Sequence, residues 1–436
     1  MIYNAKYEAI NRTELEQLQI ERLQLTLNRV YRNVKFYKNK FNEYNVNIEN
    51  INSVNDIKNL PFTTHDDLRN AYPYDMFAVP LRDIVRIHTT SGTTGKPVVV
   101  GYTKNDLHNW SEVVARTLIS AGVTNQDIVQ IAFNYGLFTG GFGFHYGAER
   151  IGASVIPASA SDNFQKQLTI MRDFKTTVIL STPGYILSII QAVAESGIHA
   201  EQLFLKTGLF GAEPWSLSLR SYIEEKLRIK AYDTYGLSEI IGPGVAAECE
   251  YKCGLHINED HFIVEVIDPK TMNPVKPGDP GELVFTTITK EGFPLIRYRT
   301  GDISSVNNVS CTCGRTLARM TRVSGRTDDM IFFNSTKFFP SQIEKVILTA
   351  EGVEPNYQII LDNKDGADTI EVKIEISDKL PAFDEIKGLE LLKTNIVKSL
   401  ETELGIMKPR ITLVEPKSLK FVADNKTVRV VDNRKK

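Results

Sequence analysis

The sequence lacks long runs of apolar residues and contains only four cysteines among its 436 residues. Four cysteines in a chain of this length do not make a disulfide framework. The apolar runs are short and interrupted by charged residues or glycine, so they do not predict a membrane span. The first residues, Met1 to Lys6, also lack the basic-then-apolar pattern of a signal peptide. These absences favour a cytoplasmic protein that has no membrane partner.

An excess of charge of one sign is also missing. Lysine and arginine number 51 and aspartate and glutamate 53, which gives a formal net charge of -2. Since this balance gives no reason to expect a polyanionic partner, we expect no nucleic-acid binding. Hydrophobic residues make up 42% of the chain, as is usual for globular proteins. The length exceeds what a single hydrophobic core supports, so more than one domain is expected.

Apolar residues recur with two different spacings. Leu23, Leu27, Val30 and Val34 are three or four residues apart and predict a helix. From residue 84 onward, short apolar runs alternate with longer amphipathic stretches, which is typical of parallel strands joined by crossover helices. The expected strands lie at residues 127–133, 153–157 and 177–180, and the expected helices at residues 165–174 and 185–196.

The C-terminal part of the chain has a different pattern. Apolar residues alternate with charged ones from Ile370 to Ile376, which predicts a strand with one buried face, and a helical pattern follows from Leu392 to Leu404. We therefore predict an α/β fold with two domains. Residues 1–327 would form a large N-terminal domain of layered sheets and helices, and residues 328–436 a small, mobile C-terminal α+β cap domain.

The segment from Thr89 to Pro97 reads Thr-Thr-Ser-Gly-Thr-Thr-Gly-Lys-Pro. Its glycines allow the backbone to approach an anion closely, its hydroxyl groups are hydrogen-bond donors, and Lys96 adds a positive charge. Such a loop is suited to holding phosphate groups. The spacing is not that of a Walker A loop, and the proline argues against the helix that would follow one. The alternative is a hydroxyl-rich turn on the surface.

Two acidic residues stand at the ends of short motifs. Glu239 ends the run Tyr-Gly-Leu-Ser-Glu, and its carboxylate is a suitable ligand for Mg²⁺. Asp302 ends the run Arg-Tyr-Arg-Thr-Gly-Asp and is suited to pairing with two vicinal ribose hydroxyls. Taken alone, each motif is also compatible with an ordinary turn.

In this order, the three motifs resemble the acyl-adenylate-forming superfamily of acyl-CoA ligases, luciferases and peptide-synthetase adenylation domains. Further segments make essentially the whole chain similar to the phenylacetate–CoA ligase family, namely residues 60–64, 135–141, 211–215, 242–245 and 325–330. The resemblance implies that ATP activates an aryl or arylacetic carboxylic acid as an acyl-adenylate. Thioester formation with coenzyme A would follow, with AMP and pyrophosphate released. The resemblance also implies a homodimer.

The resemblance implies roles for individual residues. The ATP phosphates would be held by Ser91, Gly92, Thr93, Thr94, Gly95 and Lys96. The rest of the nucleotide would contact Gly211, Ala212, Glu213, Pro214, Asp233, Tyr235, Gly236, Asp302 and Arg326. The acid would lie against Tyr135, Phe138, Gly211, Ile240 and Pro243.

Three of the implied residues are catalytic: Lys426, Glu239 and Arg326. Lys426 would lower the barrier electrostatically, because a carboxylate attacking the α-phosphate brings two anions together. Glu239 would hold Mg²⁺, which neutralises the departing pyrophosphate. Asp328 would be the hinge about which the small domain turns, so that the thiol of coenzyme A reaches the adenylate.

Ser335 and Lys337 stand where the family usually has the glycine and the asparagine of Gly-x-Asn-x-Phe-Pro. Glycine at the first position would let the backbone approach coenzyme A. The departure keeps open an adenylating enzyme that transfers the adenylate to a carrier protein or a cofactor. A catalytically silent nucleotide-binding protein is a further alternative, against which the retained Lys96, Glu239 and Lys426 argue.

Cys249, His256, Cys311 and Cys313 make up a soft Cys/His set that suits tetrahedral Zn²⁺. Cys253 competes with His256 for the fourth position. Some relatives in the family carry equivalent residues and others lack them, which indicates a structural metal rather than a catalytic one. The alternative is four unpaired thiols on neighbouring loops.

Overall fold

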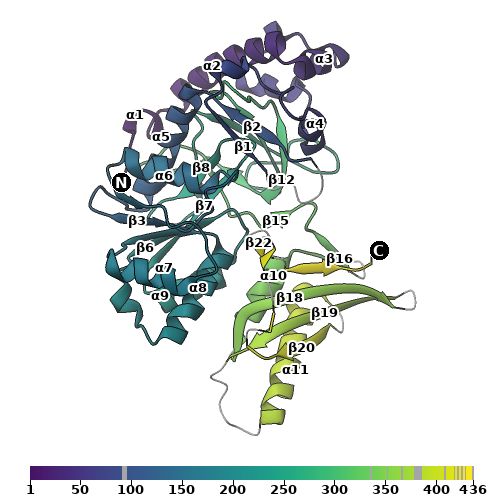
Figure 1. Cartoon of the computed structure of the whole chain (residues 1–436). Helices are drawn as coiled ribbons and strands as arrows, with labels where there is room; N and C mark the ends of the chain where they lie inside the picture. Colours follow the sequence, from purple (N-terminus) through teal and green to yellow (C-terminus); the bar gives the residue numbers. More distant parts are fainter. Residues whose placement is uncertain are drawn as a thin grey trace. The chain divides into compact units, whose positions relative to one another are not determined.

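The computed structural model shows two compact units (Figure 1). It describes residues 1–90, 96–333, 336–350, 352–364, 367–377, 385–406, 409–416, 418–419, 422–423, 426–427 and 429–434. The first unit contains Met1–Thr182, Ala192–Ala212 and Arg228–Val323. The second contains Pro183–Gln191, Glu213–Leu227 and Ser324–Lys436.

A nine-stranded sheet is the framework of the first unit, with the strand order β13-β14-β9-β8-β7-β6-β5-β3-β4. The strands from β7 to β4 in this order pair in parallel, whereas those from β13 to β7 pair antiparallel. Their bounds are β3 (Ile128–Ile131), β4 (Ser154–Ile156), β5 (Val178–Ser181), β6 (Thr207–Gly211), β7 (Lys230–Leu237), β8 (Gly242–Glu248), β9 (Leu255–Ile257), β13 (Val306–Asn307) and β14 (Arg319–Met320).

Helices connect the parallel strands, as the alternation in the sequence predicts. In chain order they are α6 (Gly140–Arg150), α7 (Phe164–Asp173), α8 (Pro183–Ser196) and α9 (Leu217–Leu227). The helix α5 (Lys104–Ser120) packs against α6 and β8. It begins at a capping box in which Asp106 N donates to Thr103 Oγ1 and Thr103 N donates to Asp106 Oδ2. Trp110, Val113 and Val114 bury the inner face of α5.

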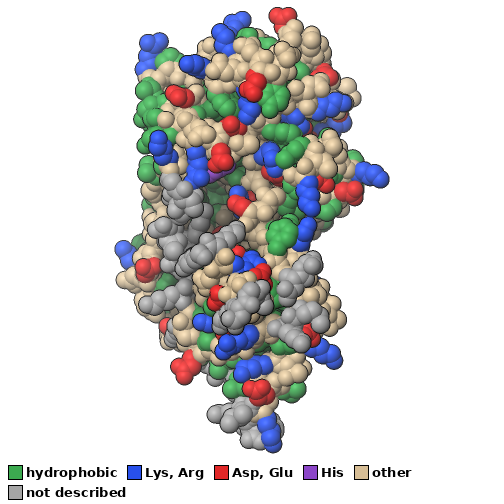
Figure 2. Space-filling view, turned by 90° about the vertical axis from the view of Figure 1, so that its right-hand side faces the viewer, with side chains coloured by type: hydrophobic (Ala, Val, Ile, Leu, Met, Phe, Trp, Pro, Cys, Tyr) green, Lys and Arg blue, Asp and Glu red, His purple; other side chains and the backbone are tan. Residues whose placement is uncertain are grey.

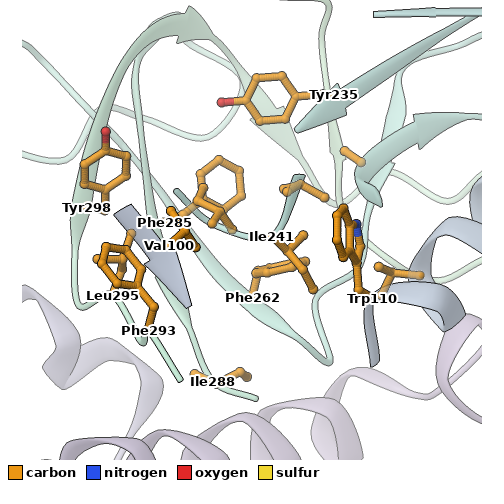
Figure 3. Close-up of a cluster of buried hydrophobic side chains, with 14 of the residues drawn as sticks. Val100, Trp110, Tyr235, Ile241, Phe262, Phe285, Ile288, Phe293, Leu295 and Tyr298 are labelled. Carbon is orange, nitrogen blue, oxygen red and sulfur yellow. The ribbon is translucent and has the colours of Figure 1, made fainter. Parts of the chain in front are cut away.

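A second sheet of the first unit contains the antiparallel strands β10 (Phe262–Ile267), β11 (Gly281–Thr287) and β12 (Tyr298–Ser304). Phe262, Phe285 and Tyr298 from these strands are almost fully buried, and they lie in the apolar cluster of Figure 3. The rings of Phe262 and Phe285 meet edge to face, with their centroids 6.4 Å apart. A separate antiparallel pair is formed by β1 (Arg86–Thr89) and β2 (Val99–Tyr102).

The N-terminal residues form short and long helices of the first unit. They are α1 (Ala5–Glu8), α2 (Arg12–Asn33), α3 (Lys35–Glu43) and α4 (His65–Asn70). Three 3-10 turns lie in the same part of the chain, at Ile48–Asn50, Val54–Asn59 and Leu81–Asp83. A 3-10 turn at Ala200–Leu203 lies between α8 and β6. The helix predicted from Leu23, Leu27 and Val30 is confirmed as α2, whose inner face these residues bury. Val34 lies one residue beyond α2 and caps its C-terminal end.

The second unit has its own sheet and core. The antiparallel strands β18 (Val353–Lys364) and β19 (Ala367–Ile376) are flanked by β23 (Val430–Asp432) and β20 (Arg410–Val414), which pair with them in parallel. The core contains Ile370, Val372 and Ile374 from β19, as the alternation predicts. Its remaining elements include α10 (Pro340–Ile347), α11 (Glu385–Leu404), β15 (Gly325–Arg326), β16 (Ile331–Phe333), β17 (Thr336–Phe338), β21 (Val422–Ala423) and β22 (Lys426–Thr427).

The predicted α/β fold class is confirmed by this architecture. The division into residues 1–327 and 328–436 stays a prediction; the compact units group residues 183–191 and 213–227 with the C-terminal residues. Among the described residues, no helix combines the length and the apolar character needed to span a lipid bilayer.

Candidate active site and metal cluster

Residues 238–241 form a turn between β7 and β8, and Glu239 lies in it. Glu239 is only 8% exposed. Its Oε1 accepts a long hydrogen bond from the Tyr298 hydroxyl at 3.5 Å and lies 4.0 Å from His65 Nε2. A carboxylate oxygen is a suitable ligand for a hard cation such as Mg²⁺.

Hydrogen bonds from neighbouring segments hold this turn. The Tyr102 hydroxyl lies 3.0 Å from the carbonyl oxygen of Ile241 and 3.5 Å from that of Ser238. The side-chain oxygens of Ser238 and Thr139 are 2.9 Å apart. The turn is therefore fixed at both ends by residues from β2 and from the loop that precedes α6.

The predicted phosphate loop lies between β1 and β2. Its residues Ser91, Gly92, Thr93, Thr94 and Gly95 lie outside the described residues. On either side of the loop, Thr90 N donates to Val98 O at 3.0 Å and Val98 N donates to Thr90 Oγ1 at 3.0 Å. Thr89 N donates to Leu137 O at 3.1 Å, two residues before the Thr139 that contacts the Glu239 turn. Lys96 is exposed.

Tyr235 and Asp302 meet between the two sheets of the first unit. The Tyr235 hydroxyl donates to Asp302 Oδ2 at 2.7 Å, and both side chains are buried. The Tyr235 ring stacks on Phe285, with centroids 6.0 Å apart (Figure 3). Asp233 lies on the same strand, β7, and its Oδ2 accepts from Arg322 Nε at 3.0 Å. The ribose-binding carboxylate predicted from the sequence is thus held by the tyrosine predicted to lie beside the nucleotide.

Two glycines of the predicted nucleotide site allow backbone segments to pack closely. A Cβ atom on Gly211 would lie 2.3 Å from the carbonyl oxygen of Thr234, and one on Gly236 would lie 2.0 Å from that of Gly242. Both contacts are with backbone atoms, which do not move away as a flexible side chain does. Ala212, next to Gly211, has a positive φ of 67°, which is uncommon for a residue other than glycine.

The residues predicted to contact the acid differ in exposure. Tyr135 and Phe138 are half-buried in the loop before α6. Ile240 is fully buried in the hydrophobic core, so its side chain packs among other apolar residues. The carbonyl oxygen of Pro243 accepts from Trp110 Nε1 at 3.0 Å.

Tyr135 begins a series of polar side-chain contacts. Its hydroxyl lies 3.1 Å from His145 Nδ1, and His145 Nε2 lies 3.1 Å from Glu149 Oε1. Burial raises the pKa of Tyr135, with Glu149 adding to the shift, so its phenol stays protonated near neutral pH.

The other predicted site residues belong to the second unit. Glu213 Oε2 accepts from Gly184 N at 3.3 Å, and Pro214 follows it. Arg326 Nε donates to Asp328 Oδ1 at 2.9 Å, between two exposed side chains. Lys426 begins β22 and is paired through its backbone with Ala423 of β21.

The four residues proposed as metal ligands come together. The ligand atoms of Cys249, His256, Cys311 and Cys313 all lie within 4.8 Å of one another. Cys313 Sγ is 3.4 Å from His256 Nε2, and Cys249 Sγ is 3.7 Å from Cys311 Sγ. Cys253 Sγ lies 3.6 Å from Cys311 Sγ but is not part of this four-residue group. It accepts instead from Arg319 Nη1 at 2.7 Å.

Burial shifts the pKa values of two side chains in this cluster. Burial, together with the nearby charges of Arg315 and Arg319, lowers the pKa of His256 to about 4, so the imidazole is neutral and offers a lone pair. Burial raises the pKa of the Cys249 thiol to about 12. A bound cation favours the thiolate strongly and reverses this effect of burial.

Comparison with known proteins identifies the family. The sequence matches the model of the AMP-binding enzyme family over residues 15–289. It matches the C-terminal domain of AMP-binding enzymes over residues 335–434. It is 41% identical to a phenylacetate–coenzyme A ligase of Thermus thermophilus over the full length of both chains. The chain belongs to the phenylacetate–CoA ligase family of AMP-binding enzymes.

A second curated ligase and a solved structure are also similar to this chain. The Escherichia coli phenylacetate–coenzyme A ligase is 45% identical over 87% of each chain. A crystal structure of a 2-hydroxyisobutyryl-CoA ligase in the postadenylation state, in complex with 2-HIB-AMP, has a TM-score of 0.93 to this chain. That likeness has 26% identity and covers all of this chain and 93% of the other. The family resemblance seen in the sequence is therefore confirmed.

Some contacts of this ligase-family site were not found from the sequence. Tyr102 and Tyr298 reach the turn of Glu239 from β2 and β12, and His65 approaches it from α4. Each lies far along the chain from the motif that it supports. The only signal for His65 is its position directly after Leu-Pro-Phe-Thr-Thr, a segment that belongs to the resemblance.

The hydrogen bond between Tyr235 and Asp302 gives a first prediction. Substitution Tyr235→Phe removes the donor and leaves a buried carboxylate with fewer partners. Since hydrogen bonds to charged groups contribute about 1.5–3 kcal/mol, we expect the free energy of unfolding to fall by about that amount. Urea denaturation measures it, with Tyr31→Phe as control, because the contact of the Tyr31 hydroxyl with Asn42 Oδ1 is long, at 3.5 Å, and exposed. Equal free energies of unfolding of the two variants would contradict a stabilising hydrogen bond between Tyr235 and Asp302.

Proposed function

We propose that this chain is an AMP-forming acid–CoA ligase that activates an aryl or arylacetic acid, phenylacetate or a near relative. The observation that carries the proposal is the 41% identity with the Thermus thermophilus phenylacetate–coenzyme A ligase over both full chains. The pairing of Tyr235 with Asp302 and the position of Glu239 in its supported turn agree with it. The proposed identity of the acid follows the names of the similar ligases.

The first half-reaction joins the acid to AMP. A carboxylate oxygen of the acid attacks the α-phosphorus of ATP, the bond between the α- and β-phosphates breaks, and pyrophosphate leaves. Asp302 accepts hydrogen bonds from the ribose hydroxyls, while the Tyr235 hydroxyl holds its carboxylate in place. Glu239 would hold Mg²⁺, and a bound Mg²⁺ would supply positive charge beside the leaving pyrophosphate. Lys426 stabilises the charge shared by the two reacting anions.

The second half-reaction uses the acyl-adenylate as an electrophile. The thiolate of coenzyme A attacks its carbonyl carbon, the bond from that carbon to the phosphate oxygen breaks, and AMP leaves. Asp328 is the hinge and Arg326 contacts the ribose or the phosphate. This assignment is what the resemblance to the family implies for the two residues.

The Cys/His cluster would hold a structural Zn²⁺. Three sulfur atoms and one imidazole nitrogen are a suitable donor set for tetrahedral zinc. The ion would tie the loop from Cys249 to His256 to the loop of Cys311 and Cys313, which are about 60 residues apart in the chain. The proposal also includes the homodimer and the cytoplasmic location that the sequence led us to expect.

Assays with and without coenzyme A test the reaction. ATP and Mg²⁺ are incubated with a panel of carboxylic acids, and pyrophosphate exchange and AMP release are measured. We expect exchange with arylacetic acids and AMP release that depends on coenzyme A. Pyrophosphate exchange without AMP release that depends on coenzyme A would contradict the ligase reaction. It would favour an enzyme that delivers the adenylate to a carrier protein or a cofactor. No exchange with any acid would leave a silent nucleotide-binding protein.

Lys426 is expected to act in only one half-reaction. Substitution Lys426→Ala removes the cation and should lower the rate of adenylation by at least about 100-fold, as for other electrostatic catalytic groups. Thiolysis of a preformed adenylate by coenzyme A should change much less. Single-turnover assays of each half-reaction separate the two effects. The same loss in both would refute the role assigned to Lys426.

Metal analysis tests the cluster. Protein purified without chelators should contain about one zinc ion per chain, as a single four-ligand site requires. Substitution Cys311→Ser should abolish retention of the metal, whereas Cys253→Ser should retain it, because Cys253 lies outside the four-residue group. A metal-free preparation of the unaltered chain, or equal loss in both variants, would count against this ligand set.

A further inference from the structure

Lys290 is a buried cationic residue that the proposed mechanism does not use. It lies in the segment between β11 and β12 and is 4% exposed. Its Nζ has no hydrogen-bond partner among the described residues. Burial lowers the pKa of Lys290 to about 7, and the carboxylate of Asp106 acts in the opposite direction. An unpaired ammonium group in this position is costly unless another interaction stabilises it.

That interaction comes from an aromatic ring. Lys290 Nζ lies 3.6 Å from the centroid of the Tyr102 ring. The Tyr102 ring also stacks with Trp110, with centroids 5.0 Å apart and an interplanar angle of 20°. A cation over an aromatic face is attracted to the ring, and the attraction is strongest where water is excluded. Lys290 and Trp110 together fix the position of Tyr102.

The hydroxyl of Tyr102 acts on the turn that carries Glu239. It lies 3.0 Å from Ile241 O and 3.5 Å from Ser238 O, the residues at the two ends of the turn. Burial raises the pKa of Tyr102 far above its usual value, so the hydroxyl keeps its hydrogen and can donate. A displacement of the ring therefore removes a support of the turn.

We propose that Lys290 is a positioning residue that fixes Glu239 through Tyr102. The ammonium group holds the ring, the ring places the hydroxyl, and the hydroxyl holds the turn in which Glu239 lies. The consequence for catalysis rests on the proposed role of Glu239 as the Mg²⁺ ligand. The effect on the turn itself does not depend on that role.

Several charged or titratable side chains lie near Lys290 and Tyr102. Among the described residues they include Asp106 from α5, Arg86 and His88 from β1, Glu239 from the turn, and Glu291, which follows Lys290 in the chain. Burial lowers the pKa of His88 to about 4, so its imidazole is neutral between pH 6 and pH 8. Loss of the Lys290 proton as the pH rises through about 7 removes the cation and should loosen the turn.

Amide hydrogen exchange tests the inference without relying on activity. In the full chain, Lys290→Met keeps the length of the side chain and removes its charge. We expect the protection of amides 238–241 to fall by about tenfold at pH 6, which corresponds to a desolvated cation–π contact. In the unaltered chain the same protection, corrected for intrinsic exchange rates, should fall between pH 6 and pH 8. In Lys290→Met it should stay constant.

Two further variants complete the test. Lys6→Met is the control, because Lys6 Nζ lies 5.2 Å from the Tyr7 ring and is exposed; amides 238–241 should keep their protection in it. Tyr102→Phe retains the ring and removes only the hydroxyl, and should expose these amides as Lys290→Met does. It also decides the outcome if Lys290→Met does not fold. Unchanged protection of the turn in Tyr102→Phe, or in a folded Lys290→Met, would overturn the inference.

Pyrophosphate exchange then connects the turn with catalysis. At pH 6, Lys290→Met should raise the KM for Mg²⁺–ATP by about tenfold with a smaller change in kcat, because the Mg²⁺ ligand is displaced. A fall in kcat alone would overturn the positioning role, since a general loss of folded protein produces that result. Absence of exchange in the unaltered chain would refute the proposed function, while the amide exchange would still decide on Lys290.

Discussion

The change from parallel to antiparallel pairing at β7 is the constraint on which the candidate site depends. The carboxyl ends of parallel strands share one edge of a sheet, and ligands bind in α/β folds outside that edge. The loop of Tyr135 follows β3, Gly211 ends β6, and Glu239 follows β7. Because β8 pairs antiparallel with β7, the chain must reverse within four residues, and this reversal keeps Glu239 at the shared edge.

Buried charged groups of the first unit are stabilised in different ways. Asp302 accepts a hydrogen bond from Tyr235, a residue of the other sheet, so the contact joins the two sheets as well as holding a carboxylate. Lys290 lies on an aromatic face instead. Arg297, nearby in sequence, makes two hydrogen bonds to Glu265. Each arrangement reduces the cost of removing a charge from water.

The sequence predicts the local elements and the chemical motifs well, because both depend on residues close together in the chain. The periodicity of Leu23 to Val30 gives α2, and the resemblance gives the family. The contacts that support the site were not predictable in the same way. Tyr102 and Ser238 are 136 residues apart in the chain, and only the strand order of the sheets brings such residues together. Likewise, the sequence left the fourth proposed metal ligand open between His256 and Cys253, and the structure groups His256, but not Cys253, with the other three residues.

Gly236 shows that a residue of a motif can be required by the fold rather than by the chemistry of the site. With only 2.0 Å between its missing Cβ and the carbonyl oxygen of Gly242, no other residue fits without a shift of the backbone. The glycine is therefore required by the sheet whether or not the protein acts on a substrate. A homologue that had lost its activity but kept this fold would still carry it, and a sequence search would still detect the motif. Within Tyr-Gly-Leu-Ser-Glu, the glycine indicates the fold of the sheet. The glutamate is the better indicator of catalytic activity.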